Sequence, residues 1–266
     1  MPGNTDIKVD TASIASIAAA IPEEDLVDAQ YDVDCSAATT DVLLILSTQR
    51  SGSTLLADLM RRSKLCLPHE YFQPYHYLPL LADRWGCIEN GLLDKQAYLD
   101  NLFRFRTFPN GWLGINLHGV HLETFARFGD FSRGLNMHYV HLQRKDLISQ
   151  AVSYEIASQT GQWSSFFEGS GEARYNFRSV KKRLRFIEEQ NAAIQAYLAE
   201  RVEPCHTIYY EDLIAAPAAT LQAIAGADIE VPPLRSEALK KQAGSINQDW
   251  VERFSARYSG NQRRAR

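Results

Sequence analysis

A short segment near the start of the chain has residue types that suit anion binding. After the apolar run 42–46, the sequence reads Thr48-Gln49-Arg50-Ser51-Gly52-Ser53-Thr54, and a helical pattern begins there. A glycine-containing loop between a strand and a helix directs backbone N–H groups and a helix N-terminus to one point. Arg50 adds a planar, multidentate donor that suits phosphate or sulfonate oxygens. We therefore predict an anion site here, with a plain strand-to-helix turn capped by serine as the alternative.

The same loop lacks the features of an ordinary nucleoside triphosphate site. The Walker A motif, Gly-x-x-x-x-Gly-Lys-Ser/Thr, needs two glycines and a lysine directly before the hydroxyl residue. This segment has one glycine and no lysine. The pattern argues against a kinase or NTPase, and an ATP-dependent, P-loop-like kinase remains the alternative enzyme class.

The loop resembles a segment of a known enzyme family. Residues 48–56 closely resemble the 5′-phosphosulfate-binding loop of sulfotransferases, and the order Gln-Arg-Ser-Gly-Ser-Thr is similar to that of the bacterial trehalose 2-sulfotransferase family. The resemblance implies that the donor is 3′-phosphoadenosine 5′-phosphosulfate (PAPS). It also implies that residues 49–54 hold the 5′-phosphate and the transferring sulfuryl group.

A second segment is similar to the stretch of this family that binds the 3′-phosphate of PAPS. There, an arginine at a strand end and a serine on the following helix hold the phosphate. Arg144 matches the arginine and Ser153 is the first match for the serine. Ser149 is the alternative, one turn earlier on the same helix face. Standing alone, the segment would fit equally well a surface helix with Asp146 at its N-terminus.

A third segment suggests the residue that removes a proton from the acceptor. Pro68-His69-Glu70-Tyr71-Phe72-Gln73 resembles the Pro-x-Glu-Phe-Phe-Gln segment of the trehalose sulfotransferases, whose proposed general base is the glutamate. The resemblance implies this role for Glu70. A sugar hydroxyl is a poor nucleophile at neutral pH, so a carboxylate must accept its proton as the O–S bond forms. The alternative is an ordinary loop carboxylate.

The predicted strand 112–118 departs from the family pattern. Asn116 stands where these sulfotransferases usually carry lysine, and His118 stands where eukaryotic relatives place a catalytic histidine. Alternation along a strand puts the two residues on one face. His118 is therefore a rival general base to Glu70, or a partner for it, and a hydrogen-bonded core histidine is the structural alternative.

We predict no metal site. His118 and His121, like His138 and His141, have the spacing His-x-x-His, but neither pair has a nearby carboxylate or cysteine set in the sequence. The four cysteines contain no Cys-x-x-Cys pair, which predicts free thiols in a reducing, cytoplasmic compartment. A late segment, 209–213, resembles the Tyr-Glu-Asp-Leu motif of the family and is interpreted as mainly structural.

The elements that must position these residues alternate between strand and helix. Each apolar run of strand length is followed by a helical pattern, which is typical of a parallel α/β sheet. The runs are 42–46, 112–118, 138–142 and 206–209. We predict a three-layer, P-loop-like sulfotransferase fold with a central parallel sheet flanked by helices and the donor site at the carboxyl ends of the strands. Loops 71–108 and 159–178 are expected to form the acceptor pocket.

Composition and charge limit the other possibilities. The chain has 266 residues, of which 45% are hydrophobic and 23% charged, as in ordinary globular proteins. No apolar run reaches the roughly 18 residues of a membrane span. The net charge of −4 argues against a nucleic-acid binder, which would need a basic excess.

The charge is unevenly distributed. Residues 1–41 hold nine acidic side chains and one lysine, a net charge of −8, which leaves +4 for the remainder. A mildly basic body suits an anionic small ligand. We predict an acidic N-terminal extension, 1–40, flexible or docked and outside the resemblance, followed by a single sulfotransferase domain, 41–266.

Together these patterns predict a metal-independent sulfotransferase. It would move a sulfuryl group from PAPS to a hydroxyl of a carbohydrate or glycolipid and release adenosine 3′,5′-bisphosphate. The resemblance also implies a homodimer. A non-catalytic nucleotide-binding scaffold is the remaining alternative, motivated by Asn116 and by the acidic extension.

Overall fold

The computed structural model describes residues 6–22, 25–33, 37–163, 167, 169, 171–226, 229–234 and 245–264. Its elements, in chain order, are η1 (Thr11–Ser13), α1 (Ile14–Ala20), η2 (Ala29–Tyr31), β1 (Asp41–Ser47), α2 (Ser53–Arg62), α3 (Tyr77–Arg84), β2 (Ile88–Glu89), β3 (Leu92–Leu93), α4 (Lys95–Arg106), β4 (Trp112–His118), η3 (Gly119–His121), α5 (Leu122–Ala126), β5 (Asn136–Gln143), α6 (Leu147–Thr160), α7 (Phe177–Ala199), β6 (Cys205–Tyr209), α8 (Tyr210–Ala215), α9 (Pro217–Ala225) and α11 (Ser245–Arg264).

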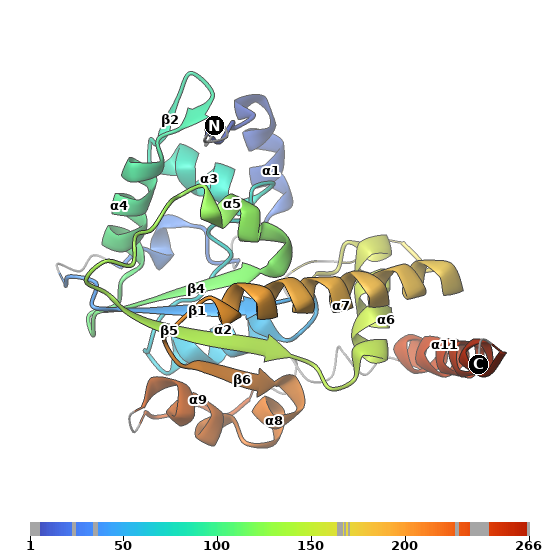
Figure 1. Ribbon diagram of the computed structural model, residues 1–266. Coiled ribbons are helices and arrows are strands. Elements are labelled where there is room, and N and C mark those ends of the chain that lie inside the picture. Colours follow the sequence, from blue (N-terminus) through green and yellow to red (C-terminus); the bar gives the residue numbers. More distant parts are fainter. Residues whose placement is uncertain are drawn as a thin grey trace.

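A four-stranded sheet with the order β4-β1-β5-β6 forms the middle layer, and its strands pair in parallel. Strand β1 is buried along almost its whole length because both faces are covered, as its uninterrupted apolar sequence predicts. Alternate residues of β1 serve opposite faces: Val42, Leu44 and Leu46 pack toward α3, α4 and α5, whereas Leu43 and Ile45 pack toward α2, α8 and α9. Figure 1 shows these helices on the two sides of the sheet. The predicted α/β architecture is confirmed.

The strand register brings three loops together. Ser47, the last residue of β1, pairs with His118 on β4 and with Leu142 on β5. Because parallel strands end at the same edge of a sheet, the segments that follow β1, β4 and β5 leave from neighbouring positions. The pattern 206–209 also proves to be a strand, β6, which pairs with β5.

The segment 71–108 is not the set of loops that the sequence suggested. It contains α3, the β2–β3 hairpin and α4. Buried Leu78, Leu81 and Ala82 give α3 an apolar face with helical spacing. Helix α4 begins where the Asp94 side chain accepts a hydrogen bond from the Ala97 N–H at 3.0 Å. Prolines and aromatic residues around these helices concealed both signals in the sequence.

The described part of the N-terminal extension lies against α3, α4 and the β2–β3 hairpin (Figure 1). The Val9 N–H donates to the Gly91 carbonyl at 2.9 Å, and the Leu93 N–H donates to the Ile7 carbonyl at 2.9 Å. Farther along, the Val33 N–H donates to the Phe105 carbonyl at 2.8 Å. We call residues 6–33 the arm.

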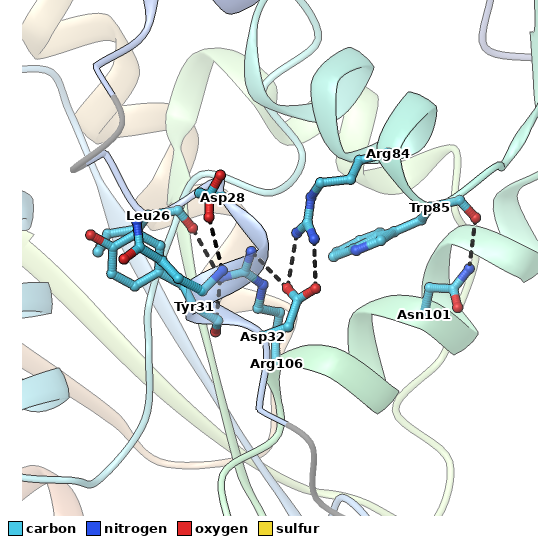
Figure 2. Close-up of polar contacts among 9 residues, drawn as sticks. Leu26, Asp28, Tyr31, Asp32, Arg84, Trp85, Asn101 and Arg106 are labelled. Atoms are coloured by element: carbon cyan, nitrogen blue, oxygen red, sulfur yellow. Dashed lines mark hydrogen bonds and ion pairs between the residues drawn. The ribbon is translucent and has the colours of Figure 1, made fainter.

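A buried arginine anchors the arm, as Figure 2 shows. The Arg106 side chain is completely buried, and its Nη1 donates to the carbonyls of Leu26 at 2.9 Å and Tyr31 at 3.3 Å. Its Nη2 lies 3.2 Å from the Asp32 carboxylate, which also forms a bidentate pair with Arg84. A buried guanidinium needs such partners because desolvation without them is costly. Among the described helices, none is both long enough and apolar enough to cross a membrane.

Substitution of Arg106 tests this anchor. Arg106→Ala should lower the free energy of unfolding by about 3 kcal/mol, because it removes the partner of two carbonyls and of Asp32. Arg84→Ala is the matched control, since it removes a partly exposed partner of the same carboxylate and should cost less than about 1 kcal/mol. Urea unfolding measures both values. Equal losses for the two variants would contradict the anchoring role.

Candidate active site

The loop between β1 and α2 depends on a glycine. Gly52 has φ +100°, and a Cβ atom there would lie 2.4 Å from Cδ2 of the Tyr210 ring. Both the backbone angle and the close approach therefore exclude a larger residue. Gly52 is the N-cap of α2 and provides no side-chain hydrogen bond, so the first N–H groups of this helix have no side-chain cap.

Helix α6 holds this loop in place. The Gln150 side chain is buried, and its Nε2 donates to Thr48 Oγ1 at 2.8 Å and to the Gln49 carbonyl at 2.7 Å. Gln150 was not among the site residues predicted from the sequence. Its position in Gln-Ala-Val-Ser, three residues before Ser153 on the helix that follows Arg144, was the available signal.

Two arginines and a serine meet beside the loop. Arg50 Nε donates to Ser153 Oγ at 3.0 Å, and an Nη1 of Arg50 contacts the Trp163 carbonyl. Arg144 Nη1 lies 3.5 Å from the Arg50 carbonyl oxygen. Burial lowers the pKa of Arg50, and the positive charge of Arg144 lowers it further. Neighbouring cations of this kind form a favourable place for a phosphate or sulfuryl group.

The two serines considered for the 3′-phosphate have different surroundings. The Ser149 N–H and Oγ both bond to the Asp146 carboxylate, at 2.9 and 2.5 Å, so this serine belongs to the N-cap of α6. Ser153 is buried and faces Arg50. The geometry thus brings Ser153, rather than Ser149, to Arg50.

The remaining loop hydroxyls also differ. Ser51 is completely buried, and its Oγ has no hydrogen-bond partner among the described residues. Ser53 is buried at the start of α2, whereas Thr54 is exposed in the same turn. A buried hydroxyl without a partner is costly, and an anion oxygen in the loop would satisfy it.

The segment after β6 contributes more than the sequence suggested. The Tyr210 ring packs on Gly52, and the guanidinium of Arg144 lies 4.4 Å from the centroid of this ring. Glu211 Oε2 accepts a hydrogen bond from the Lys145 N–H at 3.0 Å, and Oε1 lies 4.0 Å from Arg144 Nε. These residues shape and balance the charge of the anion site because β6 ends at the same sheet edge as β5.

Glu70 reaches the site from beside β4. The Asn116 N–H donates to the His69 carbonyl at 2.9 Å, and a single parallel bridge pairs His69 with Ile115. This pairing places Glu70 Oε2 3.6 Å from His118 Nδ1. The structure therefore brings together the two residues that the sequence offered as alternative bases.

Burial shifts the pKa values of Glu70 and His118 in opposite directions. It raises the pKa of Glu70 to about 7 and lowers the pKa of His118 to about 4. A carboxylate with a raised pKa is the stronger base of the two, and His118 is neutral at pH 7. The arrangement suits Glu70 as the proton acceptor and His118 as its uncharged neighbour at 3.6 Å.

His121 extends this group. Its ring lies over that of His118, with centroids 6.1 Å apart, and the polar atoms of Glu70, His118 and His121 lie within 4.8 Å of one another. The pair has no carboxylate or cysteine set with a zinc-site pattern beside it in the sequence, and Glu70 comes from a distant segment. The spacing of the three side chains would also admit a divalent cation. By contrast, His138 pairs with Asp41 at 2.8 Å at the opposite end of the strands.

Asn116 occupies a buried, neutral position. Its Oδ1 accepts a hydrogen bond from Ser47 Oγ at 3.0 Å, across the paired ends of β1 and β4. The lysine expected from the resemblance would have placed a charge here. The positive charge of the site comes instead from Arg50 and Arg144.

Comparisons with known proteins found similarity to sulfotransferases. The family model for the Stf0 sulphotransferases matches residues 128–257. A trehalose 2-sulfotransferase of Mycobacterium tuberculosis (strain ATCC 35801 / TMC 107 / Erdman) is 28% identical over 256 residues, which cover 80% of this chain and 94% of that protein. The sulfotransferase domain of an olefin synthase from Synechococcus PCC 7002 aligns with a TM-score of 0.44 and 15% identity over 82% of each chain.

The contact between Gly52 and Tyr210 can be tested by adding one methyl group. Gly52→Ala should lower the free energy of unfolding by about 2–4 kcal/mol, since it combines a strained backbone with a clash against the ring. Gly86→Ala is the control: Gly86 has φ +66° but nothing within 4 Å of an added Cβ, so about 1 kcal/mol is expected. Urea unfolding measures the free energy of unfolding of both variants. Equal losses of stability would show that the contact with the Tyr210 ring is unimportant.

Proposed function

We propose that this chain, which resembles the trehalose 2-sulfotransferases, transfers a sulfuryl group from PAPS to a hydroxyl of a carbohydrate or glycolipid. Adenosine 3′,5′-bisphosphate would be the second product. The observation that carries the proposal is the position of two arginines at the anion loop and of a half-buried carboxylate, Glu70, beside the paired ends of β1 and β4.

The residues around the β1–α2 loop fit a phosphosulfate donor. PAPS supplies the sulfuryl group. Arg50 and the backbone N–H groups of residues 51–54 would hold the 5′-phosphosulfate, and the unpartnered Ser51 hydroxyl supports this assignment. Arg144 and Ser153 would hold the 3′-phosphate. Gln49 would act through its backbone, which Gln150 already positions.

Glu70 would accept the proton of the acceptor hydroxyl. A general base works best when its pKa lies near the working pH, as that of Glu70 does. His118 would orient this carboxylate from 3.6 Å. Arg50 would stabilise negative charge on the leaving group, so that positioning and charge neutralisation provide most of the rate enhancement.

The donor site is tested by calorimetric titration with adenosine 3′,5′-bisphosphate, adenosine 5′-phosphate, and ATP with Mg²⁺. The bisphosphate should bind most tightly. Arg144→Ala should weaken its binding by about 10- to 100-fold, because a charged hydrogen bond to phosphate contributes about 1.5–3 kcal/mol. Lys145→Ala is the neighbouring control and should bind normally, since Lys145 is an exposed partner of Asp212.

Other outcomes of this titration would change the proposal. If the bisphosphate bound no better than adenosine 5′-phosphate, the 3′-phosphate contact would lie elsewhere. Tighter binding of ATP with Mg²⁺ would favour kinase chemistry. Tight bisphosphate binding without transfer to any sugar would favour a nucleotide-binding scaffold.

The base is tested by sulfuryl transfer from PAPS to trehalose, the sugar named for the mycobacterial relative. Glu70→Gln should reduce kcat by about 10²- to 10⁴-fold, the usual contribution of a general base, with bisphosphate affinity unchanged. In the wild-type enzyme, kcat/KM should fall as the pH drops below about 7, because Glu70 becomes protonated. Glu123→Gln, on an exposed turn of α5, is the control. Near-normal turnover of Glu70→Gln would assign the base role to His118.

A further inference from the structure

Three side chains beside the paired ends of β1 and β4 carry the donor atoms of a metal site. They are Glu70, His118 and His121, and their polar atoms lie within 4.8 Å of one another. Two imidazoles and a carboxylate are a typical donor set for zinc, whereas Mg²⁺ and Ca²⁺ prefer oxygen ligands. Among the described residues, this is the one group of three potential ligands that lie so close together.

The distances within this group need only a small contraction to hold an ion. Ligand atoms around a tetrahedral Zn²⁺, each about 2.0–2.1 Å from the metal, lie about 3.4 Å from one another. Glu70 Oε2 already lies 3.6 Å from His118 Nδ1. The His121 ring is nearly parallel to that of His118, with 19° between their planes. Rotation about side-chain bonds can therefore close the remaining gap while the backbone stays in place.

The ring of His118 is available for coordination. Its Nδ1 lies too far from Glu70 Oε2 for a good hydrogen bond, at 3.6 Å, and its buried Nε2 has no hydrogen-bond partner among the described residues. A buried imidazole nitrogen without a partner is costly. A histidine that binds a metal engages one ring nitrogen with the ion and leaves the other for a second partner. A bound cation would thus engage a ring that the surrounding protein leaves without a hydrogen bond.

Strand pairing fixes two of the three ligands. His118 is the last residue of β4 and pairs with Ser47, so the register of the sheet determines its position. Glu70 directly follows His69, whose carbonyl accepts a hydrogen bond from the Asn116 N–H at 2.9 Å. Both ligands are therefore held by backbone hydrogen bonding to the same strand.

Helix packing fixes the third ligand. His121 is the last residue of η3, which packs against α7. This contact is close, because a Cβ atom added to Gly119 would lie 3.0 Å from Gln190 Oε1 and 3.1 Å from the Gln190 carbonyl oxygen. Ligands that the fold already holds near one another lose little conformational freedom when an ion binds.

Charge and access also favour a cation. Glu70 supplies a negative charge, and its only ion-pair partner in the described part of the chain is His118. No described lysine or arginine therefore competes with a metal for this carboxylate. Both histidines are 7% exposed, whereas the Glu70 side chain is 24% exposed, so an ion can enter from the side of the carboxylate.

We propose that Glu70, His118 and His121 form a Zn²⁺ site, and that Zn²⁺ bound there inhibits sulfuryl transfer. A carboxylate oxygen that binds the cation cannot at the same time accept the proton of the acceptor hydroxyl. Binding of the ion does not depend on the proposed function, whereas its inhibitory effect rests on the role proposed there for Glu70.

Calorimetric titration of the untagged, chelator-treated full-length protein with ZnCl₂ tests the site. The wild-type protein should bind one equivalent, and an excess of Mg²⁺ should not compete. His121→Gln should weaken binding by at least about 100-fold, because loss of a mere hydrogen-bond partner of a ligand already costs about 10- to 100-fold. His118→Gln should have the same effect, and it carries the test if His121→Gln does not fold.

His138→Gln is the matched control. His138 also precedes a histidine by three residues and also lies beside a carboxylate, with its Nε2 2.8 Å from Asp41 Oδ1. This pair lies at the opposite end of the strands, so the variant should bind Zn²⁺ as the wild-type protein does.

NMR of the imidazole ¹⁵N nuclei tests the same site in the unaltered protein. One equivalent of Zn²⁺ should shift the ring signals of His118 and His121 and leave those of His138 in place. Unshifted signals of the first two histidines would overturn the site.

The inhibition is tested by sulfuryl transfer from PAPS to trehalose with added Zn²⁺, each variant being compared with its own metal-free rate. The Zn²⁺ concentration that halves the wild-type rate should match the dissociation constant from calorimetry. It should rise in His121→Gln by the same factor as that constant. An unchanged concentration in this variant, or activation by Zn²⁺, would overturn the inhibitory role.

The site and the proposed function fail in different ways. Absence of Zn²⁺ binding, or equal binding by the wild-type protein, His121→Gln and His118→Gln, would overturn the site and leave the sulfotransferase intact. Absence of transfer by the metal-free wild-type protein would overturn the proposed function and the inhibition that rests on it. The calorimetric and NMR results would then still decide whether the three residues bind Zn²⁺.

Discussion

The parallel pairing of β1 with β4 on one side and β5 on the other is the constraint on which the rest of the molecule depends. The register aligns Ser47 with His118 and with Leu142, so the segments after these three strands start together. Burial of both sheet faces makes a shift of this register costly, because polar strand ends would enter the core. Strand register therefore holds the anion loop, Arg144 and the pair His118 and His121 at one edge of the sheet. No set of bonds that joins all of these groups is needed to keep them there.

Electrostatics divides this edge into two parts with opposite requirements. On the side of β5, the positive charges of Arg50 and Arg144 repel each other, and an anionic donor would relieve this repulsion. On the side of β4, the protein surroundings of Glu70 and Asp25 limit their hydration and raise the pKa of each to about 7. A reaction that places negative charge near the arginines reduces their repulsion. If it also delivers a proton to the carboxylate, it removes the unfavourable negative charge there. Sulfuryl transfer to a hydroxyl has this pattern of charge movement.

Polar contacts join the arm to the rest of the protein. Burying Arg106 requires partners for its N–H groups, and the arm supplies them through two carbonyls and Asp32. In return, the Asp25 carboxylate of the arm accepts a hydrogen bond from the Tyr77 hydroxyl, and the Tyr77 ring packs against His69. This acidic segment, which the sequence predicted to be flexible or docked, thus includes two carboxylates, Asp25 and Asp32, that contact Tyr77, Arg84 and Arg106.

The sequence by itself determined the parallel α/β fold and the strands at 42–46, 112–118 and 138–142, and it offered Arg50, Arg144, Glu70 and His118 as candidate site residues. These features are local: an uninterrupted apolar run, a glycine loop, or an arginine at a strand end can be read within ten residues. Only the tertiary structure decided that Ser153 rather than Ser149 meets Arg50, that Glu70 lies beside His118, and that Tyr210 and Gln150 shape the anion loop. Those contacts join residues that are far apart in the chain, and they depend on strand register and on which helix covers each face. The proton affinity of Glu70 and the position of Asp25 follow from burial, which exists only once the core has closed.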